Sequence, residues 1–215
     1  MKLTKSIFVS ALTIIGAAAI VSSCSDRPDL EGTWQGNQER IQVAGASEAF
    51  STVSIDFAPS AEKNAPGLVN LSAVVEVHAP AASADSGAVQ PWQANVTATA
   101  SVSGTYVFEE HEDDDIILSL DRSTLLVRVD PAGVVSTFNV LDGTDSAALD
   151  SLTQAAVAQW SQVIGRGVME QFGKYNRIED IKVHHGDMLT AEIADRDLTF
   201  RRTAAQKNGA ALYAS

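Results

Sequence analysis

This sequence has a single cysteine, Cys24, and aromatic residues make up only 6% of it. An exported protein that relied on disulfides would need paired cysteines, so we expect the fold to rest on its hydrophobic core alone. Basic residues are also scarce, with 15 lysines and arginines against 27 aspartates and glutamates. Such a surface repels nucleic acid and anionic lipid headgroups, which excludes nucleic-acid binding.

The first residues have the order of a secretory signal peptide. Lys2 and Lys5 precede the uncharged, mostly apolar run Ile7–Ile20, and small residues follow it. This order predicts that residues 1–23 are removed as a signal peptide. The alternative is a retained membrane anchor, but the run is too short to cross about 30 Å of hydrocarbon comfortably.

Val21-Ser22-Ser23-Cys24, directly after the apolar run, resembles the lipobox of bacterial lipoproteins. That resemblance implies cleavage before Cys24, a diacylglycerol thioether on its sulfur and an acylated N-terminus, so the membrane becomes a partner through lipid. Residues 24–29 would form a tether of at most about 20 Å. Ser25 after the cysteine favours the outer membrane in such families, with the periplasmic or surface face left open. The mature chain would carry 13 basic and 27 acidic residues.

Alternating apolar and polar residues predict strands with one buried face along most of the chain. The clearest are Val53–Phe57, Val69–Val77 and Trp92–Phe108, and Gly104 in the last predicts a bend or bulge. Further strands are expected at Ile116–Leu120, Leu125–Val129, Val134–Val140, Ile178–Val183, Met188–Ile193 and Leu198–Arg202, with a turn at Pro131–Gly133.

One segment changes to helical spacing. Leu149, Leu152, Trp160 and Val163 lie at steps suited to one helix face, and Gly165–Gly173 contains three glycines expected to bend or stop the helix. Two placements are open for this helix, Leu149–Gly167. It either packs on the outside of the sheet, or covers or plugs its mouth through these four apolar residues.

Nine or ten strands with short connections and one late helix predict a mainly β domain over residues 30–204, followed by a loose tail at 205–215. Closing an antiparallel sheet into an up-and-down barrel removes its exposed edges, so we favour a barrel over the alternative, a β-sandwich.

The two ends of this domain resemble the lipocalin-like (calycin-type) β-barrels, which open with Gly-x-Trp and close with an arginine lying on that tryptophan. Here the motif is Gly32-Thr33-Trp34, and Leu198-Thr199-Phe200-Arg201-Arg202 ends the domain. If Leu198 and Phe200 point inward, the two-residue period puts Arg202 on the same face, so Arg202 is the expected cation–π partner of Trp34. With the lipobox, the whole resembles lipocalin-like lipoproteins of Bacteroides-type bacteria.

Two clusters contain residues that could form a chemical site. Glu109–Asp115 is either a solvated hairpin tip or a cation site, and it lacks the spaced acidic pattern of a calcium loop. His184–Asp187 is either a tight turn or a metal corner, but adjacent histidines on an extended chain point to opposite faces. The sequence offers no recognisable nucleophile motif, so we expect no catalytic residues, no metal, no cofactor and no enzymatic activity.

Two functions follow from this reading. The first is a lipid-anchored envelope protein that binds a small apolar ligand inside a lipocalin-like barrel. The second is the same barrel with a filled interior, acting as an interaction or accessory subunit of an outer-membrane complex. Small side chains on the strand at 92–103 leave space that either a ligand or the helix could fill.

Overall fold

The computed structural model of the protein describes residues 27–60, 62, 65–80, 93–135 and 146–203. The elements within these ranges are β1 (Gly32–Arg40), β2 (Glu48–Ala58), β3 (Gly67–Pro80), β4 (Gln93–Phe108), β5 (Ile116–Leu120), η1 (Arg122–Thr124), β6 (Leu126–Val129), α1 (Pro131–Val135), α2 (Ser146–Phe172), η2 (Gly173–Asn176), β7 (Arg177–His184), β8 (Met188–Glu192) and β9 (Asp197–Arg202).

The strands form one antiparallel sheet in the order β3-β2-β1-β9-β8-β7-β5-β4-β6, and β3 pairs again with β4. This second pairing closes an eight-stranded barrel. β6 does not count as a further strand of the barrel wall, because it shares one edge of β4 with β5. β6 pairs with Ala98–Ser101 of β4, and β5 pairs with Gly104–Phe108. The predicted mainly β barrel with an inserted helix is confirmed, and the sandwich alternative is wrong.

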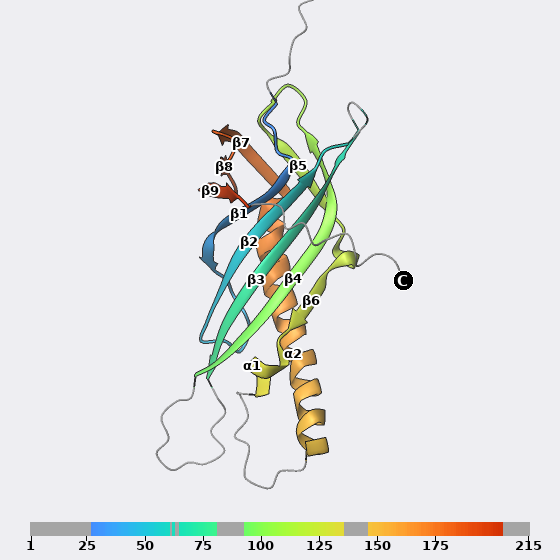
Figure 1. Ribbon diagram of the computed structural model, residues 1–215, viewed down its shortest axis with the longest axis vertical. Coiled ribbons are helices and arrows are strands. Elements are labelled where there is room, and N and C mark those ends of the chain that lie inside the picture. Colours follow the sequence, from blue (N-terminus) through green and yellow to red (C-terminus); the bar gives the residue numbers. More distant parts are fainter. Residues whose placement is uncertain (1–26, 61, 63–64, 81–92, 136–145, 204–215) are drawn as a thin grey trace, which may run out of the picture.

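The barrel consists of a long part and a short part. β2, β3 and β4 pair along most of their length, whereas β7, β8 and β9 form two short hairpins (Figure 1). The two parts meet at two narrow seams. β1 pairs with β9 only at Trp34↔Arg202 and Gln35↔Arg201, and β5 pairs with β7 only at Ile116↔Ile178 and Ile117↔Arg177.

The predicted alternation places the core as expected. In β2 the odd-numbered residues from Ala49 to Phe57 are buried, and in β3 those from Val69 to Val77 are. The same parity rule puts the even-numbered residues of β4 inside, from Val96 to Tyr106. Every second side chain of these strands thus points into the long part of the barrel and fills its interior.

The helix is longer than its sequence predicts. α2 runs through Gly165 and Gly167 to Phe172, so the expectation that it bends or stops at the first two glycines is wrong, although it does end just before Gly173. One face of its last two turns is buried, and its first half extends past the strand ends (Figure 1). Gly167 is needed for close contact, because a Cβ there would overlap the backbone carbonyl oxygen of Gln42.

The bulge expected at Gly104 and the turn expected at Pro131–Gly133 are both wrong. Gly104 makes no bulge: its pairing with Val69 keeps the register of β3 and β4, and its missing side chain lets the backbone of Ser119 approach. Pro131–Gly133 is not a turn before a strand but the start of helix α1, which also takes in Val134. Asp130 caps this helix by accepting from the amide of Ala132 at 3.0 Å, and proline suits a first helical position. The rest of the strand expected to 140 lies outside the described residues.

The glycines of α2 give a matched test of helix packing. Gly167→Ala should destabilise the protein by about 1–3 kcal/mol, because the new methyl group meets backbone that cannot move aside easily. Gly165→Ala should be neutral or stabilising by up to about 1 kcal/mol, since its Cβ would lie 3.4 Å from Val127 Cγ2 and alanine favours helix. Urea unfolding of both variants measures the difference; equal midpoints would show that α2 does not pack against Gln42 in this way.

Candidate functional site

The end of the barrel where β1 starts is sealed by the two residues expected there. Trp34 is fully buried, and the guanidinium carbon of Arg202 lies 4.5 Å from the centroid of its ring. The two residues are direct partners across the β1–β9 seam. The structure therefore brings Trp34 and Arg202 together as a cation–π pair.

The residues before β1 complete this seal. Leu30 is buried, and its carbonyl accepts a hydrogen bond of 2.8 Å from the indole nitrogen of Trp34. Arg202 donates to the carbonyl of Asp29 at 3.1 Å and pairs with its carboxylate at 3.5 Å. The start of the domain is thus tied to its last strand, which leaves no polar group of the indole unpaired.

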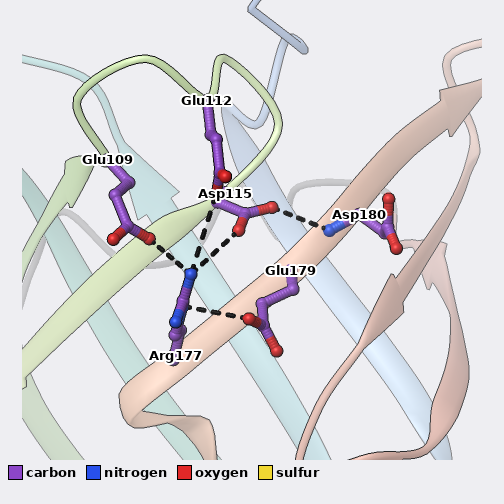
Figure 2. A network of polar contacts seen from close by, with 6 residues as sticks. All are labelled: Glu109, Glu112, Asp115, Arg177, Glu179 and Asp180. Atoms are coloured by element: carbon purple, nitrogen blue, oxygen red, sulfur yellow. Dashed lines mark hydrogen bonds and ion pairs between the residues drawn. The ribbon is translucent and has the colours of Figure 1, made fainter.

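The acidic segment between β4 and β5 lies at the same end and surrounds an arginine of β7. Arg177 lies 2.7 Å from Glu109, 3.3 Å from Asp115, 3.1 Å from Glu179 and 3.7 Å from Glu112. Figure 2 shows these carboxylates around its guanidinium group. Asp115 is only 7% exposed, so the prediction of a wholly solvated tip is wrong for this residue. Arg177 was not identified from the sequence, because no local pattern connects it to a segment more than sixty residues away.

The chain folds locally to bring Asp115 into this network. The carboxylate of Asp115 also accepts from the backbone amide of Asp180 at 3.0 Å, and the backbone carbonyl of Asp114 accepts from the amide of Ile181 at 3.0 Å. Asp180 has a positive φ of 51°, where β7 departs from regular pairing with β8. The buried carboxylate therefore holds an irregular stretch of β7 against the β4–β5 connection.

The charges in this network shift the pKa values of its members. The hydrogen bond that Glu112 shares with Asp115, with the charges of Asp115 and Glu109, raises the pKa of Glu112. Partial burial lowers the pKa of Arg177, but Glu109, Glu179 and Asp115 outweigh that effect and raise it. The cluster thus holds more negative charge than its one arginine neutralises.

A metal ion is the other species that such a cluster suits. Glu109, Glu112 and Asp115 each offer a carboxylate oxygen, and the three atoms lie within 4.8 Å of one another. Arg177, however, already contacts all three carboxylates from β7. The arrangement is therefore that of an ion-pair network around an arginine, and a cavity of about 420 Å³ lies beside it, lined mostly by charged residues.

The four helix residues expected to cover the barrel mouth differ in how far they are buried. Trp160 and Val163 are half-buried and pack against the core, and Leu149 is half-buried. Leu152 is 55% exposed. The buried residues of α2 lie in the next turns instead: Ile164, Val168, Gln171 and Phe172.

A buried hydrogen bond ties this end of α2 to the inner face of β2. Ser51 donates to the side-chain carbonyl oxygen of Gln171 at 2.6 Å, and both residues are buried. Because Ser51 lies in the inward-facing row of β2, the end of α2 packs against the inner face of that strand. The sequence signal for this contact was weak, since serine and glutamine both interrupt apolar patterns.

The outer face of β2, β3, β4 and β6 carries a patch with few charges. Two adjoining cavities of about 570 and 360 Å³ lie over it, and both include Val74 and Arg128. Val74 is 51% exposed and Leu126 48%. Paired rows of the patch are Thr52–Val74–Thr99–Arg128 and Ser54–Ser72–Ser101–Leu126.

The histidine segment forms a tight turn. His185 and Gly186 have positive φ angles of 52° and 79°, and the amide of Asp187 donates to the carbonyl of His184 at 3.3 Å. His184 contacts Thr190 at 3.1 Å while His185 is exposed, so the two rings share no ligand position.

Cys24, the residue expected to carry lipid, lies outside the described residues. Across the part of the chain that the structure describes, none of the helices has the length and hydrophobicity to cross a membrane.

No protein-family model matches this chain, and a search of curated proteins found no match either. The closed antiparallel barrel is compatible with a lipocalin-like fold.

The seal predicts unequal effects of its two neighbouring arginines. Trp34→Ala should cost about 3–5 kcal/mol of unfolding free energy, as expected for removing a fully buried aromatic ring. Arg202→Ala should cost about 1–2 kcal/mol through loss of the cation–π contact. Arg201→Ala is the matched control and should change stability by less than about 0.5 kcal/mol, since Arg201 is exposed. Similar losses for Arg201 and Arg202 in urea unfolding would contradict the seal.

The network around Arg177 predicts a pH-dependent effect. Arg177→Gln should lower the urea midpoint at about pH 7.5, because four carboxylates lose their shared cation. The pKa of Glu112 is already raised, and loss of the lowering charge of Arg177 would raise it further in the folded state. A raised folded pKa makes stability fall as pH increases through that range. The deficit should therefore shrink as pH falls toward about 4.5. Lys182→Gln, which removes an exposed cation 3.8 Å from Asp180, is the control; a deficit independent of pH would rule out the charge argument.

Proposed function

We propose that this chain is a lipid-anchored protein of the cell envelope that acts as an interaction or accessory subunit of an outer-membrane complex, with its barrel filled by its own helix. The single observation that carries this choice is the position of α2. Its last turns pack against the inner face of β2, where Gln171 bonds to Ser51, and Gly167 lies against the backbone of Gln42. A protein whose interior is occupied in this way acts through its surface.

The proposed anchor rests on the Val21-Ser22-Ser23-Cys24 motif after an apolar run. Two or three acyl chains at Cys24 would give lasting attachment, since each buried methylene contributes about 0.8 kcal/mol. A mature chain with 27 acidic residues has little affinity of its own for anionic membranes, so it needs such an anchor.

The competing function is the binding of a small apolar ligand inside the barrel. It requires room beside the small inward residues of β4, Ala98 and Ala100, which are both buried. α2 contacts β4, and a Cβ at Gly165 of α2 would lie near Val127 in β6 and near Leu125, which directly precedes β6. A ligand would therefore have to displace the helix, and ligand binding is the less favoured of the two functions.

A soluble form that begins at Arg27 separates the two functions by fluorescence. A filled barrel should leave tryptophan emission unchanged on titration with a fluorescent fatty acid, and the dye should show no saturable enhancement. Saturable binding that Phe172→Ala strengthens would instead identify a carrier in which α2 covers the cup.

Native mass spectrometry of the protein taken from its host envelope adds an independent test. We expect the mass of the chain from Cys24 onward plus acyl groups, with a protein partner in fixed ratio. A monomer that retains a separate small lipid would contradict the accessory role. An unacylated chain would contradict the anchor.

A further inference from the structure

The residues just before β1 are fixed on the barrel at its acidic end. Arg27 donates to the carboxylate of Asp113 at 3.2 Å, and its guanidinium carbon lies 4.7 Å from the centroid of the Phe108 ring. Asp29 is held by Arg202, and Leu30 is buried. Residues 27–30 therefore follow the surface of this end, and Arg27 contacts the β4–β5 connection in particular.

The chain between this contact and the proposed acylation site is very short. Only Ser25 and Asp26 separate Cys24 from Arg27. Three peptide steps reach at most about 10 Å, so the lipid-bearing sulfur has to lie close to Arg27 and Asp113.

The other end of the molecule is much farther away. β4 has 16 residues and therefore spans about 50 Å from the β4–β5 connection to the opposite end of the barrel. The first half of α2 extends beyond that opposite end (Figure 1). A tether of about 10 Å cannot bring both ends to one bilayer in an upright molecule.

We propose that the barrel stands on the membrane in one orientation, with the Glu109–Asp115 segment facing the lipid headgroups and the first half of α2 pointing away. This inference rests on the proposed acylation of Cys24. Arg27 is the positioning residue: it directs the tether toward Asp113 and Phe108, on the β4–β5 side of the barrel end.

The Glu109–Asp115 segment, which would face the membrane in this orientation, is negatively charged. The segment contains six carboxylates, and Arg27 and Arg177 are the cations that the described residues place against them. An end with excess negative charge is repelled by anionic headgroups over a Debye length of about 8 Å at physiological salt. The lipid anchor and the charge therefore act in opposite directions, which holds this end near the bilayer without inserting it.

The experiment uses the full-length acylated protein in vesicles that contain a headgroup-attached nitroxide lipid. A fluorophore is placed on a new cysteine at one of two exposed positions, Glu110→Cys in the acidic segment or Gln154→Cys in the first half of α2. The thioether at Cys24 leaves the new thiol as the labelling site. We expect quenching at position 110 to exceed that at position 154 at least ~3-fold, given the separation of the two ends.

Arg27→Glu should reduce the 110-to-154 ratio, because it replaces the ion pair with repulsion from Asp113 and removes the contact with Phe108. Arg122→Glu makes the same charge change on an exposed residue of η1 and should leave the ratio unaltered. If Arg27→Glu also leaves it unaltered, Arg27 does not position the tether.

Two further outcomes separate this inference from the proposed function. Protein that carries acyl groups and floats with the vesicles, yet is quenched equally at both positions or more at 154, overturns the orientation alone. Wild-type protein whose mass shows no acyl group, and which does not float, overturns the anchor and the orientation together. Cys24→Ala is the reference for unanchored protein.

Discussion

The barrel depends on the contact between Trp34 and Arg202. Only two residue pairs join β1 to β9, and Trp34↔Arg202 is one of them. A seam that short has few ladder hydrogen bonds, so side-chain contacts have to stabilise it. The buried indole, the guanidinium over its face and the hydrogen bond to Leu30 provide them. The second seam, between β5 and β7, is equally short and also has an arginine, Arg177, whose partners are carboxylates instead of a ring. Each closure of the sheet thus relies on one arginine.

The difference in length between β2–β4 and β7–β9 explains the position of α2. β2, β3 and β4 extend past β7–β9, which leaves an apolar inner face without strands opposite it. The end of α2 covers this face, with Phe172 fully buried and Gln171 bonded to Ser51. Gly167 lets the helix approach the chain at Gln42. The packing that completes the core therefore places the end of α2 against this inner face.

Regular patterns made much of this fold predictable, and long-range contacts made the rest unpredictable. Period-two alternation located β2, β3 and β7–β9, and the phase of Leu198 and Phe200 identified Arg202 as the residue facing Trp34. The helix was predicted too short because glycine is unfavourable in an isolated helix. Here the helix contains Gly167 because only a residue without a side chain fits against the backbone of Gln42. The Arg177 network could not be foreseen, since its members are separated by many residues and carry no spacing rule. Asp115 within an acidic run gave no sign that it, unlike Glu110, would be buried.

Native-state hydrogen exchange tests the closure of the barrel most directly. The amide of Thr203 donates across the first seam to Thr33, and the amide of Ile181 donates across the second to Asp114. If the two seams close one cooperative barrel, both amides should exchange through openings of lower free energy than the β3 amides, and Arg202→Ala should lower both values together. Faster exchange at Thr203 with no change at Ile181, or protection at both amides equal to that of β3, would contradict a barrel held shut by its two arginine seams.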